Sequence, residues 1–333
     1  MATKRYTALV LPPDDRLADV CSPRCRKMLL EQFDAKWNTT GSDYDRDALS
    51  GMIHDAEVVL TSWGSPNIDE SLLDRATKLK FVGHAAGTVK RLVPGSIFDR
   101  GIRVFSAAPR IAQSVAEYCL AVLLASMRRL TEFDSSVRRG DWKNTTGVGV
   151  ELSGKSVGIV SASSTARGFI ELLRPFKVQL LIYDPFLSEE EARRLGATKA
   201  SLEQVMGCPV ISVHAPTLPE TEGMITKEHL RMIPDGAFLI NSSRASVIDE
   251  AALITELKTG RFRAALDVYT KEPLPASSPL LSLENVLLTP HIAGHAVEGH
   301  QGLMEAVVSD ILAAIEGRPT RYEVKKDVWQ RIA

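Results

Sequence analysis

The segment Ser156-Val157-Gly158-Ile159-Val160-Ser161-Ala162-Ser163-Ser164-Thr165-Ala166 gives the clearest indication of the fold class. A short apolar run ends at Val160, and an amphipathic segment from Arg167 to Pro175 follows a turn of small residues. An apolar run, a turn and an amphipathic segment, repeated along a chain, predict parallel strands joined by helices. The next apolar run ends at Asp184 and completes a βαβ unit.

Similar short β-rich runs continue to the C-terminal part of the chain. Helical or loop segments separate them, so we predict a doubly wound parallel sheet in an α/β protein. Its strands are predicted at Ser156–Val160, Leu180–Tyr183, Val210–Val213, Ala237–Ile240, Ala264–Leu266 and Val286–Leu288.

An upstream series predicts a second α/β unit. Its strands are expected at Thr7–Leu11, Val58–Thr61 and Lys80–His84, with a helix at Glu70–Ala76 capped by Asp69. A long apolar helix should follow from Gln113 to Leu130, and a last helix from Gly302 to Glu316 should return to the first unit. A chain of 333 residues is too long for one ordinary core and suits two domains.

The composition is that of a soluble globular protein, with 44% hydrophobic and 24% charged residues. A formal net charge of -1 without a basic tract gives no reason to expect nucleic acid or an anionic membrane as a partner. The first apolar run, Ala8 to Leu11, is interpreted as a buried strand rather than a signal peptide or membrane span. The four cysteines match neither a zinc ribbon nor a CxxC motif, which favours free thiols in a reducing cytoplasm.

Three chemically capable side chains stand at or just past the ends of apolar runs: Arg244, Glu272 and His291. An arginine guanidinium can bind a carboxylate or a keto oxygen through two hydrogen bonds. A histidine moves a proton near neutral pH, and a neighbouring glutamate favours its charged form. The three predict a site that reduces a 2-oxo acid, provided that a hydride donor binds upstream. His291 and His295 are four apart, but Pro290 and Gly294 interrupt a helix there and no third ligand is evident, so we expect no metal site.

The expected donor site lacks its usual glycines. A dinucleotide fold carries G-x-G-x-x-G after its first strand, and here Ser161, Ser163 and Ala166 hold the three positions. All three side chains are small, and the helix that begins here still offers free N–H groups to phosphates. Asp184 lies where an acidic residue hydrogen-bonds the ribose hydroxyls of the cofactor, and this favours NAD over NADP. Alternatively, Asp184 could be a turn residue before Pro185.

Taken together these residues resemble the NAD-dependent D-2-hydroxyacid dehydrogenases over nearly the whole chain. The segments that carry the resemblance are Leu152–Ile159, Val213–Pro216, Leu239–Arg244, Leu266–Val268 and Leu287–His295. The resemblance implies two doubly wound parallel-sheet domains, Rossmann-like and flavodoxin-like, with a cleft between them. It implies a discontinuous substrate domain, residues 1–108 and 297–333, and a NAD-binding domain inserted between them at residues 109–296.

The resemblance also implies roles. Arg244 would bind the substrate carboxylate and keto oxygen, Glu272 would pair with the catalytic histidine, and His291 would be the general acid/base. The backbone of Ala86, Gly87 and Thr88 would receive the substrate carboxylate. Cofactor contacts are expected from Ser161, Ser163, Ser164, Thr165, Ala166, Asp184, Pro216, Ser242 and Asp267, the last holding the nicotinamide carboxamide.

Two hypotheses remain open. The first is an enzyme that transfers hydride between NAD(H) and a 2-oxo or D-2-hydroxy acid. The second is a weak or inactive binding protein that keeps the dehydrogenase scaffold, which the missing glycines favour. The family resemblance further implies a homodimer, with its interface on the helix Gln113–Leu130 and the arm Arg138–Gly149.

Overall fold

The computed structural model describes residues 5–142 and 147–332, and these form two compact units. The first comprises residues 1–111 and 295–333, and the second comprises residues 112–294. No helix in the described parts of the chain is both long enough and apolar enough to cross a membrane.

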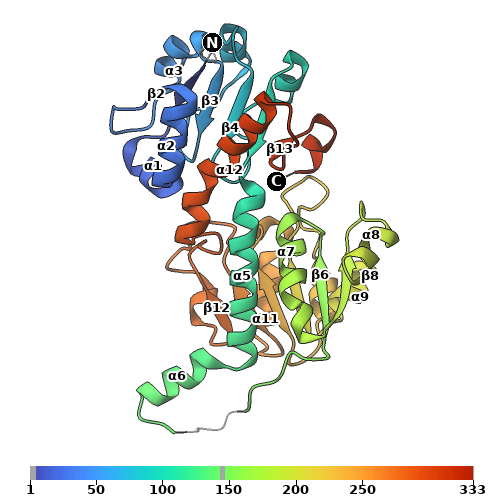
Figure 1. The fold of residues 1–333 in the computed structure, drawn as a ribbon. Coiled ribbons are helices and arrows are strands. Elements are labelled where there is room, and N and C mark those ends of the chain that lie inside the picture. Colours follow the sequence, from blue (N-terminus) through green and yellow to red (C-terminus); the bar gives the residue numbers. More distant parts are fainter. Residues whose placement is uncertain (1–4, 143–146, 333) are drawn as a thin grey trace. The chain divides into compact units, whose positions relative to one another are not determined.

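The first unit is built on a six-stranded sheet of order β13-β5-β4-β3-β1-β2 (Figure 1). All neighbours run parallel except β13, which pairs antiparallel with β5. The order β2-β1-β3-β4-β5 is the flavodoxin-like one. The strands are β1 (Tyr6–Val10), β2 (Phe33–Trp37), β3 (Val58–Thr61), β4 (Phe81–His84), β5 (Arg103–Ser106) and β13 (Glu323–Val324).

Helices cover both faces of this sheet because its strands are apolar on both sides. One face packs against α1 (Asp14–Val20), α2 (Pro23–Gln32) and α12 (Val297–Ile315). The other face packs against α3 (Arg46–Met52), α4 (Glu70–Arg75) and short 3-10 turns. Asp69 caps α4, as expected, by accepting a hydrogen bond from the Leu72 amide at 3.0 Å.

The second unit is a seven-stranded, wholly parallel sheet of order β12-β11-β10-β9-β6-β7-β8. Its core order from β8 to β11 is the 3-2-1-4-5-6 order of a Rossmann sheet, with the switch point between β6 and β9. The strands are β6 (Ser156–Val160), β7 (Gln179–Tyr183), β8 (Ala197–Lys199), β9 (Val210–Val213), β10 (Phe238–Asn241), β11 (Arg263–Leu266) and β12 (Val286–Leu288).

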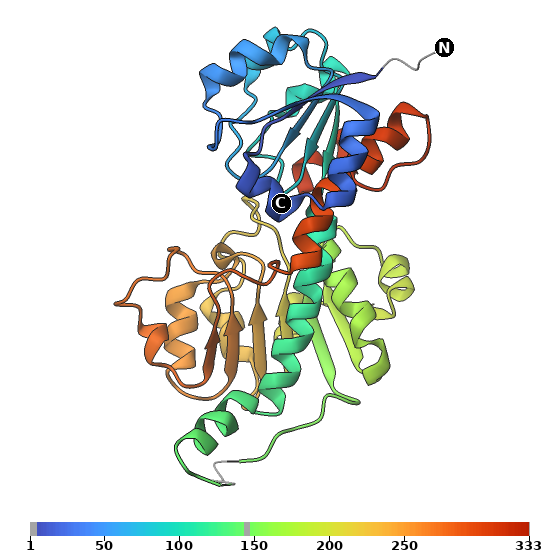
Figure 2. The same ribbon diagram turned by 60° about the vertical axis from the view of Figure 1, so that its left-hand side comes forward.

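Two layers of helices cover the second sheet. The helices α5 (Ala108–Met127) and α7 (Ser164–Leu173) share one hydrophobic core with it, and both lie along the sheet in Figure 2. The opposite core holds α9 (Leu202–Met206), α10 (Lys227–Met232) and α11 (Glu250–Leu257). The remaining helices are α6 (Leu130–Arg138) and α8 (Glu189–Arg194). The doubly wound α/β fold predicted from the sequence is confirmed in both units.

The predicted bounds of two helices were wrong. The long helix starts at Ala108, not Gln113, because Pro109 suits a first helical turn and Ser106 Oγ accepts the Ala108 amide hydrogen bond. It ends at Met127, where the Val150 amide donates to the Met127 carbonyl. The last helix starts at Val297 rather than Gly302, because that glycine lies inside the helix and leaves room for the Arg110 side chain.

The antiparallel strand β13 is held to β5 by an ion pair. Glu323 accepts hydrogen bonds from Arg103 Nε at 2.8 Å and Arg103 Nη2 at 2.7 Å, and its side chain is 8% exposed. Arg103, together with Lys325 and Thr320, outweighs the effect of burial and lowers the pKa of Glu323 to about 2 from an ordinary 4.5. The folded state therefore gains stability above pH 4.5 and loses it as the pH falls towards 2.

We expect Glu323→Gln to lower the unfolding free energy at pH 7 by ~1–3 kcal/mol, because Arg103 loses a charged partner. The loss should shrink as the pH falls from 4.5 towards 2, because Glu323 protonates first in the unfolded chain and only near pH 2 in the folded wild type. Urea titrations of the full chain at several pH values measure both effects. Glu316→Gln removes an exposed pair with Arg318 and should change stability by less than ~0.5 kcal/mol. Equal losses in the two variants would contradict the assignment.

Candidate active site

Arg244, Glu272 and His291 lie beyond the carboxyl ends of β10, β11 and β12, three neighbouring strands of one sheet. His291 Nδ1 is 2.7 Å from Glu272 Oε2, and Glu272 Oε1 accepts a hydrogen bond from the Tyr269 amide at 3.0 Å. The structure thus brings together the histidine and the glutamate that the sequence singled out. The His291 side chain remains 52% exposed, so its other ring nitrogen can meet a ligand.

The charge of Glu272 is maintained by its neighbours. Burial alone would raise its pKa, but the hydrogen bonds from His291 and the Tyr269 amide, and the nearby charges of His291 and Arg244, reverse this and lower it. Glu272 is therefore ionised at neutral pH and fixes His291 Nδ1 as a hydrogen-bond donor. Proton exchange with a ligand is then left to His291 Nε2.

Arg244 is presented by a turn that Asn241 organises. The buried Asn241 side chain donates to the Arg244 carbonyl at 3.1 Å and accepts from the Ser243 amide at 3.1 Å. The guanidinium is half-buried, and its Nη1 donates to the Ser243 carbonyl at 2.7 Å. A guanidinium held beside its own backbone is a pre-oriented receptor for a carboxylate or keto oxygen.

His291 has a left-handed backbone, with φ at +56°. This conformation costs a non-glycine residue roughly 1–2 kcal/mol. The fully buried Asp267 stabilises it by accepting hydrogen bonds from the Ile292 and Ala293 amides, both at 2.8 Å, and from Thr289 Oγ1 at 2.6 Å. Asp267 therefore positions the loop that carries His291, and its contact with a nicotinamide carboxamide remains a prediction.

The proposed cofactor loop lies at the switch point of the same sheet. Ser161 has φ at +75°, so it keeps the left-handed turn that glycine makes freely. Ser163 is the N-cap of α7 and its hydroxyl accepts from the Ala166 amide at 3.3 Å. Ser164 and Thr165 form the first turn of α7, where helical amides have no partner within the helix. A helix start of this kind fits the pyrophosphate of NAD.

Asp184 is tied to this loop. One of its oxygens accepts from the Ala162 amide at 2.8 Å and from Ser161 Oγ at 3.3 Å, and the other accepts from the Phe186 amide at 2.8 Å. These bonds support the turn role of Asp184, whereas its contact with a ribose remains a prediction. Its carboxylate stabilises the serine-containing loop directly.

His214 is a polar residue whose importance the sequence did not reveal. It follows β9 at the switch point, is 4% exposed and packs against Phe169 of α7. Neither ring nitrogen has a hydrogen-bond partner among the described residues, and burial lowers its pKa to about 3, so the imidazole is neutral. A histidine directly after an apolar strand and before Ala215-Pro216 was the available signal. Pro216, a predicted cofactor contact, lies in this segment. Ser242, another predicted contact, follows β10, and its Oγ is 3.1 Å from Cys119 Sγ.

The loop Ala86–Thr88 follows β4 in the first unit. The buried His84 ring bonds to Thr61 Oγ1 at 2.9 Å and to the Thr88 backbone, and Ser106 Oγ donates to the Gly87 carbonyl at 3.0 Å. These contacts fix the position of the loop within the first unit. A Cβ at Gly87 would meet no atom within 4 Å, so the open side of the loop can admit a ligand.

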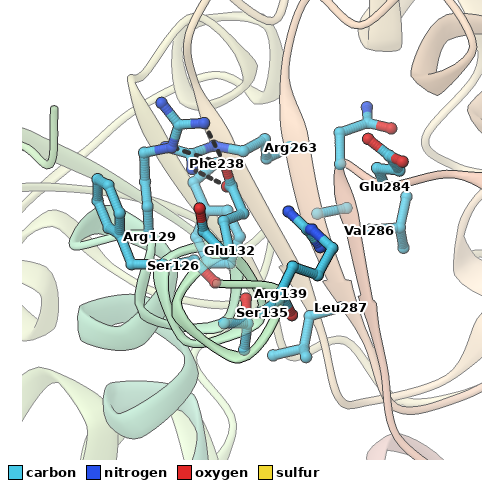
Figure 3. A pocket seen from close by; sticks show the side chains of 15 residues that line it. Ser126, Arg129, Glu132, Ser135, Arg139, Phe238, Arg263, Glu284, Val286 and Leu287 are labelled. Carbon is cyan, nitrogen blue, oxygen red and sulfur yellow. Dashed lines mark hydrogen bonds and ion pairs between the residues drawn. The ribbon is translucent and has the colours of Figure 1, made fainter. Parts of the chain in front are cut away.

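A separate pocket of about 550 Å³ lies at the opposite edge of the second sheet (Figure 3). It includes residues at or near the starts of β10, β11 and β12, and Glu132 there pairs with both Arg129 and Arg263. Catalytic groups of parallel sheets lie at the carboxyl ends of the strands. This pocket contains none of the site residues predicted from the sequence.

A family comparison agrees with this geometry. Residues 120–293 match the model of the D-isomer specific 2-hydroxyacid dehydrogenase, NAD binding domain. This is more than half of the chain. The protein belongs to the D-isomer specific 2-hydroxyacid dehydrogenase family. The matched segment falls within the second unit, so the NAD-binding domain of the family is the unit that carries Ser161, Asp184 and His291.

Members of this dehydrogenase family are also found among individual relatives. D-3-phosphoglycerate dehydrogenase of Archaeoglobus fulgidus is 34% identical over 77% of this chain and 49% of its own length. Glyoxylate reductase of Korarchaeum cryptofilum is 31% identical over 80% of this chain and 81% of its own. The chain spans about half the length of the curated phosphoglycerate dehydrogenases that it matches.

Solved structures share the family fold. A phosphoglycerate oxidoreductase from Rhizobium etli gives a TM-score of 0.82 at 24% identity, covering 96% of this chain and 99% of that one. A D-mandelate dehydrogenase from Rhodotorula graminis gives a TM-score of 0.81 at 21% identity, covering 97% and 98%. At these identities the likeness establishes the fold alone.

The Ser161→Gly variant tests the predicted cofactor loop. Glycine relieves roughly 1–2 kcal/mol of backbone strain at the left-handed φ and removes the Cβ of this turn residue. It also removes the 3.3 Å hydrogen bond from Ser161 Oγ to Asp184. We expect NADH binding to tighten by a few-fold, up to about tenfold, in isothermal titration. Ser188→Gly, an exposed helix cap outside this loop, is the matched control and should leave NADH affinity unchanged. An affinity that falls in Ser161→Gly would show that the hydroxyl matters more than the strain.

Proposed function

We propose that this protein transfers hydride between NAD(H) and a 2-oxo or D-2-hydroxy acid, with His291 as the general acid/base. The observation that carries the proposal is the 2.7 Å pair of His291 Nδ1 and Glu272 Oε2 beside Arg244. A histidine oriented by a carboxylate, with an arginine close by, is suited to protonating a carbonyl oxygen. Family membership and the relatives named as dehydrogenases and reductases support the same reaction.

Each residue has a defined part. NAD(H), when bound at the switch point, supplies or accepts the hydride. His291 Nε2 gives a proton to the carbonyl oxygen during reduction and takes it back during oxidation. Glu272 stabilises the imidazolium and keeps its orientation. Arg244 binds the substrate carboxylate and keto oxygen, and the backbone amides of the Ala86–Thr88 loop receive the carboxylate.

The cofactor should be NADH rather than NADPH. Asp184 directly follows β7 and presents a carboxylate near the loop, where a 2′-phosphate would be repelled. We also infer a homodimer formed through the helix predicted at Gln113–Leu130 and the arm Arg138–Gly149, of which residues 143–146 lie outside the described residues. The four cysteines are free and buried, which fits a reducing cytoplasm.

A binding or regulatory protein on the same scaffold is the second candidate. The loop without glycines favours it, because Ser161 carries strain where relatives of the fold use glycine. Titration with NADH separates the candidates, since an enzyme must bind its cofactor at millimolar concentration or below. The kept His291–Glu272 pair and the capped start of α7 favour the enzyme.

His291→Asn should lower kcat/KM for 2-oxo acids by at least roughly 10²-fold and leave NADH affinity nearly intact. Asparagine tolerates a left-handed backbone, so the Asp267-bound loop should stay folded. Steady-state kinetics and NADH titration of the same preparation measure both effects. His54→Asn, at an exposed position in the first unit, controls for general damage. A variant that keeps a tenth of wild-type kcat/KM would refute the role of His291.

Gly87→Ala should weaken substrate binding without unfolding the loop. The added methyl meets no protein atom within 4 Å and the backbone needs no left-handed φ, so it occupies only the space open to a ligand. We expect KM for a 2-oxo acid to rise at least about fivefold while the melting temperature stays within about 2 °C. Gly101→Ala, also without neighbours but at a left-handed φ of +71°, should instead lower stability and leave KM unchanged. An unaltered KM in Gly87→Ala would exclude the loop from the substrate site.

A further inference from the structure

The first unit carries a cluster of aromatic rings that the proposed chemistry does not use. Trp63 follows β3 and its ring centroid is 5.2 Å from that of His300, on the first turns of α12. The His300 ring is in turn 4.4 Å from the ring of His295 in a T-shaped arrangement. His300 is buried, whereas Trp63 is half-buried and His295 is exposed, so the cluster has an accessible side.

The charges around this cluster compensate one another. Asp19 of α1 bonds to His300 Nδ1 at 2.8 Å through one oxygen and faces Arg16 Nη1 at 3.4 Å through the other. The Arg16 guanidinium lies 6.0 Å from the centre of the Trp63 ring. The Arg16 guanidinium beside Trp63 therefore already has the Asp19 carboxylate as a partner. This carboxylate would repel a strongly anionic ligand group.

Trp63 stands next to the loop proposed to receive the substrate carboxylate. Thr61 and His84 are register partners in the parallel pair β3 and β4, and Trp63 and Ala86 each lie two residues further on. The Ala85 amide donates to the Thr61 carbonyl at 2.8 Å, and Ser62 Oγ donates to the Ala85 carbonyl at 2.9 Å. The two chain segments thus continue side by side at about one strand spacing, roughly 5 Å.

Resting on the proposed function, we propose that Trp63, backed by His300, forms the wall of the subsite for the substituent at C3 of the 2-oxo acid. The substituent that fits is an aromatic ring, because an indole stacks or packs edge-to-face with another ring. A phosphoryl group does not fit, because Arg16 is neutralised and Asp19 is close. The chain should thus favour 3-aryl-2-oxo acids, such as phenylpyruvate, over 3-phosphonooxypyruvate.

Substrate profiles of the full-length protein test this subsite. Initial rates of NADH oxidation are compared for phenylpyruvate, pyruvate and 3-phosphonooxypyruvate with the wild type, Trp63→Ala and Trp37→Ala. Trp37 is a matched control, since it is half-buried at the end of edge strand β2 and also lies under an arginine, Arg26, at 4.8 Å. In Trp63→Ala the ratio of kcat/KM for phenylpyruvate to that for pyruvate should fall at least tenfold. In Trp37→Ala this ratio should not change.

Other outcomes overturn the subsite or the reaction separately. A wild type that prefers 3-phosphonooxypyruvate to phenylpyruvate, or a ratio unchanged in Trp63→Ala, overturns the subsite while the reductase activity stands. If no 2-oxo acid is reduced, the proposed function fails, and calorimetry with phenylpyruvate then decides the subsite. Binding that is lost in Trp63→Ala and kept in Trp37→Ala supports it, and absence of binding to the wild type overturns it.

Discussion

The hydrogen bonds of the Asp267 carboxylate are the interaction on which the candidate active site depends. Two backbone amides and one hydroxyl of the loop after β12 converge on this fully buried side chain, and the loop therefore keeps His291 in a left-handed conformation. Glu272 can align the imidazole only because this neighbouring loop is already fixed.

A second constraint operates where the cofactor should bind. Glycine normally provides both the turn and the space for a pyrophosphate, and here small side chains provide them with less freedom. Asp184 offsets part of the strain by binding the Ala162 amide and the Ser161 hydroxyl. In this loop, hydrogen bonds from Ala162 and Ser161 to Asp184 stabilise a turn that a glycine could adopt without strain.

The sequence predicted six of the seven strands of the second sheet, all but β8, because parallel buried strands are short apolar runs followed by polar residues. Arg244, Glu272 and His291 could be named for that reason. Asp267 was named only as a cofactor contact, and its role in fixing the His291 loop was not predicted, since hydrogen bonds from the Ile292 and Ala293 amides leave no pattern in side chains. The edge strands β2 and β13 were also missed, because polar residues such as Asp34 and Lys36 interrupt the apolar pattern and β13 spans two residues. The cluster of Trp63 and His300 joins residues more than two hundred positions apart, which periodicity cannot detect.

The discontinuous first unit has a consequence for synthesis on the ribosome. One face of its sheet is covered by Leu303, Met304, Val307 and Ile311 of α12, and these residues are translated after the whole second unit. Until they emerge, the strands β1, β3, β4 and β5 lack an apolar layer and are exposed to aggregation. The second unit is a continuous segment and can fold without waiting. We therefore expect the nascent chain to fold its second unit before its first, and to need chaperone protection for its N-terminal sheet.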